Sequence, residues 1–232
     1  MNALYRLFLR SQLVRGRIIG LGCLGLLAIL LGFAVGISDE AGPEDGAQLV
    51  SVYGLALFVP VTVLLFASAV LGDPNEDGTL VYLWLRPVAR WKVVLAAFAA
   101  TLTICLPLVV LPMAVAAALA GEGDLVAGAV ASCTLATVAY AGVFTWLGLR
   151  VKRALVWGLA YILIWEGFVA RAGATPSKLS VRAATRSVLG RLADGPDDFL
   201  EVGAAAAVAI PLVAATAALL LAVRRLSRQD VA

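Results

Sequence analysis

The sequence predicts an all-α, polytopic membrane protein with six transmembrane helices. The chain is 62% hydrophobic and only 14% charged, whereas a soluble domain carries about 25% charged residues. Its charges lie in short blocks between apolar stretches, and most stretches approach the roughly 20 residues that a helix needs to cross a bilayer. Because lipid offers the backbone no hydrogen-bonding partners, we expect these stretches to be helical. The strict apolar and polar alternation of a membrane β-barrel does not occur in the sequence.

We interpret residues 1–232 as one transmembrane domain. In residues 1–17, Leu4, Leu7 and Phe8 share one face and the arginines lie elsewhere. This pattern predicts a basic amphipathic helix at the membrane interface; the alternative is a frayed extension of the first span. The predicted spans cover residues 18–37, 49–71, 93–120, 125–149, 154–170 and 202–223. Two G-x-x-x-G pairs on the first span permit close helix approach: Gly16 with Gly20, and Gly32 with Gly36.

The basic residues predict that both termini are cytoplasmic. Thirteen of the 18 Lys and Arg residues fall in segments that then lie inside the cell: Arg6, Arg10, Arg15, Arg17, Arg86, Arg90, Lys92, Arg150, Lys152, Arg153, Arg224, Arg225 and Arg228. The first two outer loops, residues 38–48 and 121–124, contain none. This asymmetry is the positive-inside pattern of multi-pass proteins. The other five Lys and Arg residues lie in the predicted outer loop, residues 171–201, and this loop departs from the positive-inside pattern.

The connection between the second and third spans, residues 72–92, predicts a short helix on the inner membrane surface. Asp73 is placed to cap the free amides of a helix start, Pro74 suits the first helical position, and Glu76 completes a capping box. The following turns place three apolar residues on one face: Leu80, Leu83 and Trp84. Pro87 then ends the helix. The alternative interpretation is a solvated connector.

This connection resembles the inner loop of ABC type-2 permeases. It contains Glu76-Asp-Gly-Thr-Leu80, several hydrophobic residues, and then Arg86-Pro-Val-Ala-Arg90 and Lys92. The family has roughly E-x-x-G-T-L there, followed by P-V-S-R and a basic residue. Its position between the second and third of six spans agrees as well. In this sequence one residue, rather than two, separates Glu from Gly, and Ala89 replaces the usual Ser.

The resemblance implies a permease subunit of an ATP-driven exporter in the bacterial inner membrane. Two cytoplasmic ABC ATPase subunits would bind a pair of permease subunits, the second identical or paralogous, surrounded by membrane lipids. The loop would serve as a coupling helix in a cleft of the ATPase, through Glu76, Gly78, Thr79, Leu83, Arg86, Pro87 and Arg90. We expect no cofactor in this chain, because it lacks the G-x-x-x-x-G-K-[ST] phosphate loop. ATP and Mg²⁺ would bind to the partner ATPase.

Glu166 is the one acidic residue predicted within a span, near the outer end of the fifth. An ionisable group at that depth is costly and is a candidate functional group. Three interpretations stay open: it lines the substrate path, it pairs with Arg171 or Arg182 at an outer gate, or it reaches the interface and is solvated. In the outer loop, residues 180–192 predict a short outer or re-entrant helix before the last span. Its arginines either meet anionic headgroups or an anionic substrate, or extend to the interface.

Other function classes are disfavoured. The sequence has no His, which excludes His-dependent metal sites and catalytic triads, and no paired carboxylates lie within the spans. We therefore expect neither an enzyme nor a metal site. No basic stripe with interleaved aromatics indicates a nucleic-acid partner, and Cys23, Cys105 and Cys133 are interpreted as apolar residues of the spans.

The alternative to an exporter is an ATPase-linked membrane sensor or force-transmitting assembly factor that passes no solute. A continuous substrate-sized cavity at the interface of the two permease subunits would favour the exporter, and a tightly sealed interface would favour the alternative.

Overall fold

The computed structural model describes residues 2–38, 42–77, 89–121, 123–168, 179–193 and 196–228. These residues form helices and their connections, with no strand among them, so the all-α prediction is confirmed. The helices are α1 (Asn2–Gln12), α2 (Arg15–Gly36), α3 (Pro43–Leu49), η1 (Val50–Phe58), α4 (Val59–Glu76), α6 (Arg90–Ala120), α7 (Gly123–Arg150), α8 (Ala154–Ala160), η2 (Tyr161–Glu166), α10 (Val181–Leu192), η4 (Asp197–Phe199) and α11 (Ala204–Arg228). Of these, η1 and η2 are π-helical and η4 is a 3₁₀ turn.

Five helices in the described part of the chain are long and apolar enough to cross a membrane. They are α2, the continuous helix of residues 44–76, α6, α7 and α11. The expectation of a polytopic membrane protein is thus confirmed, although the described residues contain five, not six, continuous helices of membrane-spanning length. In place of the span at 154–170, α8 and η2 form one helix, Ala154–Glu166. Its 13 residues extend about 20 Å, less than the roughly 30 Å of a hydrocarbon core.

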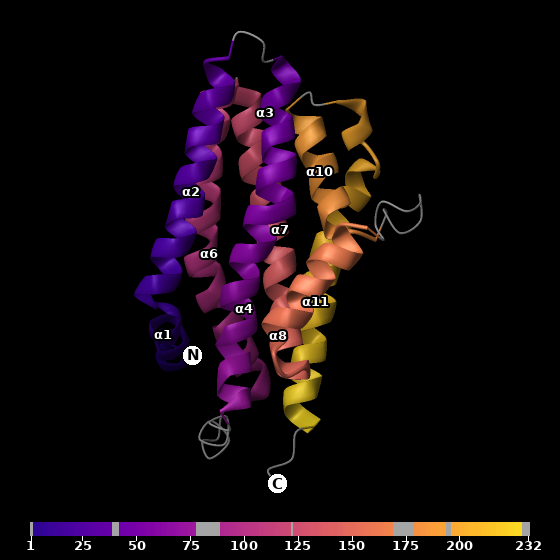
Figure 1. The fold of residues 1–232 in the computed structure, drawn as a ribbon. Coiled ribbons are helices and arrows are strands. Elements are labelled where there is room, and N and C mark those ends of the chain that lie inside the picture. The colour runs from indigo at the N-terminus through magenta and orange to yellow at the C-terminus, as the bar shows by residue number, and fades with distance from the viewer. Residues whose placement is uncertain are drawn as a thin grey trace.

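The chain continues this fifth crossing in a second piece, α10. In Figure 1, α8 occupies the lower half of the bundle and α10 the upper half, both beside α7. The contacts agree with this view. Tyr161 packs edge-on against Phe144 of α7, with ring centroids 6.1 Å apart, whereas Leu189 of α10 lies against Gly128 near the start of α7. The 16 residues between Gly128 and Phe144 span about 24 Å of helix.

The helix predicted outside the membrane before the last span is therefore part of the bundle. One face of α10 is buried, including Ala184 and Leu189, and the re-entrant alternative describes it better than an outer helix. We call the pair formed by Ala154–Glu166 and α10 the discontinuous segment.

The end of α4 also differs from the prediction. Asp73 and Pro74 lie in the last turns of α4, which runs to Glu76, and do not start a new helix. Two contacts explain the extension. Gly72 packs against the backbone of Gly148 in α7, and Asp73 forms an ion pair of 3.6 Å with Arg17. Pro74 has no backbone N–H and cannot donate the usual helical hydrogen bond. Membrane helices tolerate this loss.

Small residues set the closest helix approaches. A Cβ atom at Gly148 would collide with the carbonyl oxygen of Ser68, and one at Gly32 with the backbone of Ala116 in α6. Gly36 is equally close to α6, so the second G-x-x-x-G pair does permit close packing. Gly16 and Gly20 have no neighbouring atom within 4 Å, and the first pair makes no such contact.

The N-terminal helix α1 covers residues 2–12 of the predicted 1–17 and packs on α6. Phe8 is buried, Tyr5 Oη donates to Thr103 Oγ1 at 2.9 Å, and Gln12 Nε2 donates to Thr101 Oγ1 at 3.1 Å. Leu7, which the pattern placed on the apolar face, is exposed.

Candidate functional site

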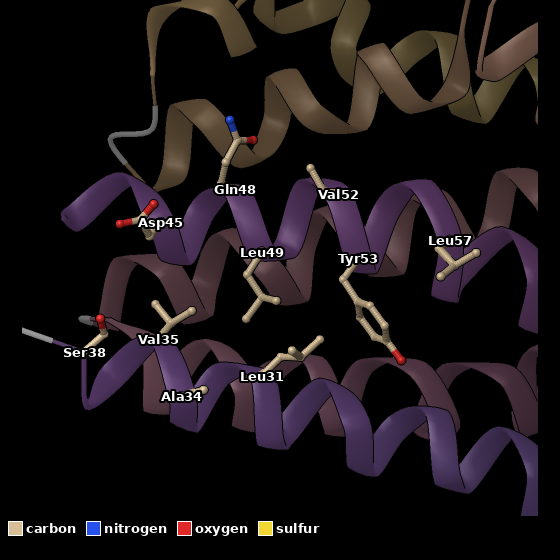
Figure 2. A pocket seen from close by; sticks show the side chains of 10 residues that line it. All are labelled: Leu31, Ala34, Val35, Ser38, Asp45, Gln48, Leu49, Val52, Tyr53 and Leu57. Atoms are coloured by element: carbon tan, nitrogen blue, oxygen red, sulfur yellow. The ribbon is translucent and has the colours of Figure 1, made fainter. Parts of the chain in front are cut away.

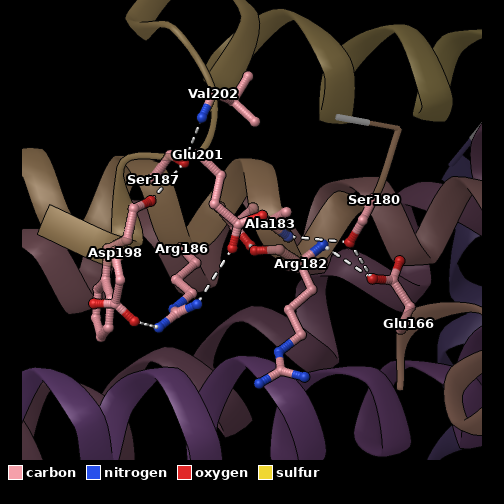
Figure 3. A network of polar contacts seen from close by, with 11 residues as sticks. Glu166, Ser180, Arg182, Ala183, Arg186, Ser187, Asp198, Glu201 and Val202 are labelled. Atoms are coloured by element: carbon pink, nitrogen blue, oxygen red, sulfur yellow. Dashed lines mark hydrogen bonds and ion pairs between the residues drawn. The ribbon is translucent and has the colours of Figure 1, made fainter. Parts of the chain in front are cut away.

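Glu166 is a buried carboxylate at the break of the discontinuous segment. It is the last residue of η2 and is only 4% exposed, so it is not solvated at an interface. Its Oε1 accepts from the Tyr161 hydroxyl at 3.2 Å, and its Oε2 accepts from Ser180 Oγ at 2.5 Å and from the Arg182 backbone N–H at 3.3 Å. Figure 3 shows the contacts of Glu166 with Ser180 and Arg182 at the start of α10. The carboxylate thus sits at the positive end of the α10 dipole.

Ser180 connects Glu166 to the cap of α10. It is the N-cap residue, and its Oγ accepts from the Ala183 N–H at 3.1 Å while donating to Glu166. A serine before a helical run is the signal that sequence reasoning missed here. Arg182 meets Glu166 through its backbone amide, and its guanidinium extends toward α3 and η1 (Figure 3). Arg171 lies outside the described residues.

Two further arginines fix α10 to the segment before α11. Arg186 forms ion pairs with Asp198 at 2.7 Å and with Glu201 at 3.3 Å, and its guanidinium lies 4.1 Å from the centroid of the Phe199 ring. Arg191 donates to the carbonyl oxygens of Ser187 and Val202. Both guanidinium groups therefore have partners within the chain.

Two cavities flank the helix of α3 and η1 on this side of the molecule. The smaller, about 240 Å³, is polar and lies between that helix and α10, beside Glu166, Arg182 and Arg186. The larger is a groove of about 780 Å³ between α2 and the α3–η1 helix. Figure 2 shows Ser38 and Asp45 at one end of the groove and Leu57 at the other. Its volume is in the range of small-molecule sites, and most of its lining is apolar.

Glu76 makes a second carboxylate contact at a helix start, at the opposite end of Ala154–Glu166. It ends α4, and its Oε1 accepts from the Arg153 backbone N–H at 2.6 Å. Arg153 is the N-cap residue of α8 and adopts the left-handed conformation, with φ 55° and ψ 48°. That conformation costs a residue with a Cβ atom about 1–2 kcal/mol. Sequence analysis singled out Glu76 but gave no signal for Arg153 as its partner.

The other predicted coupling residues are only partly visible. Arg90 is the first residue of α6, after the cap residue Ala89. The remaining five lie outside the described residues: Gly78, Thr79, Leu83, Arg86 and Pro87. The structure thus brings Glu76 to the α7–α8 turn and Glu166 to the start of α10. The helix between these two contacts is about 20 Å long.

The chain matches a known protein family. The family model described as "ABC-2 family transporter protein" matches residues 10–171, which are 162 of the 232 residues. No curated protein matches the chain. The matched region runs from the end of α1 past η2, and it includes the predicted coupling loop and the first half of the discontinuous segment. This multi-pass membrane protein therefore belongs to the ABC-2 transporter family.

Proposed function

We propose that the chain is the membrane-spanning permease subunit of an ATP-driven exporter. The observation that carries this proposal is the family match over residues 10–171 in a chain without a phosphate loop. ATP and Mg²⁺ would bind to two separate ABC ATPase subunits. A second permease subunit, identical or paralogous, would complete the membrane part.

The basic end of the bundle is the face that we propose for the ATPase. Figure 1 places α1, the end of α4, the start of α6, the α7–α8 turn and the end of α11 at this end. The positive-inside rule makes it the cytoplasmic end, in the bacterial inner membrane. Of the predicted coupling segment, residues 72–92, the described parts are the end of α4 and the start of α6, and both lie at this end.

The open apolar groove between α2 and the α3–η1 helix supports a binding site for a hydrophobic compound. Its volume of about 780 Å³ matches the size of small-molecule sites. Hydrophobic compounds and lipids that increase ATP hydrolysis by the complex in vesicles would support export. An unchanged rate with all of them would favour the alternative.

The coupling role is tested by two variants, Gly78→Pro and the double variant Arg86→Ala/Arg90→Ala. Both should still insert in the membrane but bind the ATPase about tenfold more weakly, a change of about 1.4 kcal/mol. The matched control is Arg224→Ala/Arg225→Ala, which removes two charges from α11 at the same end. ATPase binding would be measured on the purified complex in detergent. Wild-type binding by both coupling variants would contradict the coupling role.

A further inference from the structure

Each half of the discontinuous segment begins beside a glutamate from a preceding helix. Glu76 at the end of α4 accepts the Arg153 N–H at the start of α8. Glu166 at the end of η2 accepts the Arg182 N–H and the Ser180 hydroxyl at the start of α10. Two carboxylates thus join three helical pieces end to start: α4, Ala154–Glu166 and α10.

The first of these contacts holds a strained residue. Among the described residues, Arg153 is the only non-glycine with a positive φ. Such strain persists where the surroundings hold the backbone in place, and it often occurs at switch regions. The Glu76 carboxylate supplies one such restraint. It accepts from a backbone amide, so the contact depends on the acceptor at residue 76 and not on the Arg153 side chain.

The first half of the segment is also packed on α4. Gly158 of α8 lies so close to Leu64 that a Cβ atom would collide with the leucine side chain. The helix is therefore fixed to α4 at its first residue through Glu76 and one turn later through Gly158. Its far end is η2, whose wide turns bond less regularly than an α-helix and end at Glu166.

We propose that Glu76 is a positioning residue that makes α8 move with the cytoplasmic end of α4. Glu166 then passes this movement to the start of α10. The proposal rests on the proposed function, because the ATPase supplies the movement of α4. It assigns the discontinuous segment as the route from the ATPase end to the polar cavity beside Glu166, Arg182 and Arg186.

The test measures backbone hydrogen exchange in the permease–ATPase complex with and without ATP. In the wild type, ATP should change the exchange of residues 154–166 and 181–186. Glu76→Ala should reduce this ATP-dependent difference several-fold. Glu76→Gln should retain it, because the amide oxygen still accepts the Arg153 N–H. Asp77→Ala is the matched control: it removes the neighbouring carboxylate and keeps Glu76, which accepts the Arg153 N–H.

A merely structural role of Glu76 would speed exchange equally in both nucleotide states and leave the ATP-dependent difference intact. That result would overturn the proposal, as would a wild-type complex that hydrolyses ATP without any change in residues 154–166. If Glu76→Ala does not assemble, Glu76→Met, which keeps the side-chain length without the acceptor, gives the same test. A wild-type chain that binds no ABC ATPase would contradict the proposed function instead.

Discussion

Glu166 is kept within the bundle by donors from its own chain. An isolated buried charge costs several kcal/mol, and here a tyrosine hydroxyl, a serine hydroxyl and a backbone amide contact the carboxylate. The α10 dipole adds a favourable field. Glu76 also accepts a backbone amide at a helix start, that of α8, but this contact is exposed. Its loss should therefore lower the free energy of unfolding less than the loss of Glu166.

Replacing Glu166 separates its structural role from a role in transport. Glu166→Ala leaves the Ser180 hydroxyl and the Arg182 amide without this acceptor, and we expect it to lower the free energy of unfolding by about 2–3 kcal/mol. Glu166→Gln retains an acceptor and should lose less than half as much. Chemical denaturation in detergent measures both. A fully stable Ala variant would contradict the structural role. Unchanged export by the Gln variant would exclude a role of the charge in the substrate path.

At the scale of helices, hydropathy predicted the long apolar spans and failed where the backbone changes direction. Residues 154–170 have the composition of a span, but Ala154–Glu166 ends at a carboxylate whose donors come from Ser180 and Arg182, 14 and 16 residues later. No short-range pattern contains that contact. Likewise, Asp73-Pro74-Asn-Glu76 has the local signature of a helix start. Because Gly72 packs on Gly148, α4 instead continues through these residues.

The same close packing predicts which glycine the fold requires. Gly148→Val would place a branched side chain against the carbonyl of Ser68, and α4 and α7 would have to separate. We expect a loss of about 2–3 kcal/mol in unfolding free energy, the range of overpacked cores, measured by denaturation in detergent. Gly20→Val is the control, because nothing lies within 4 Å of that site. Equal stability of the two variants would contradict the tight α4–α7 contact.

The whole molecule has two unlike ends. One end carries α1, the end of α11 and the Glu76 contact, and the other carries the end of α2, the start of α3, the end of α6 and the start of α7. The sequence has no Lys or Arg between α2 and α3 or between α6 and α7. The groove and the polar cavity lie toward this second end, on either side of the α3–η1 helix. This arrangement separates the surface proposed for the ATPase from the groove and the polar cavity, and the discontinuous segment lies between them.

The orientation of these ends can be tested with single cysteines. Ser38 and Ser227 are both exposed. Ser38 follows the end of α2 and Ser227 lies in the last turn of α11, and these two helix ends lie at opposite ends of the bundle. In a Cys23→Ser background, which removes the exposed native thiol, Ser38→Cys should react with a membrane-impermeant maleimide added to intact cells. Ser227→Cys should react only after the membrane is opened, because the positive-inside rule places Arg224, Arg225 and Arg228 in the cytoplasm. The reverse labelling pattern would place the basic end outside, away from any cytoplasmic ATPase, and would contradict both the topology and the coupling role proposed for Glu76.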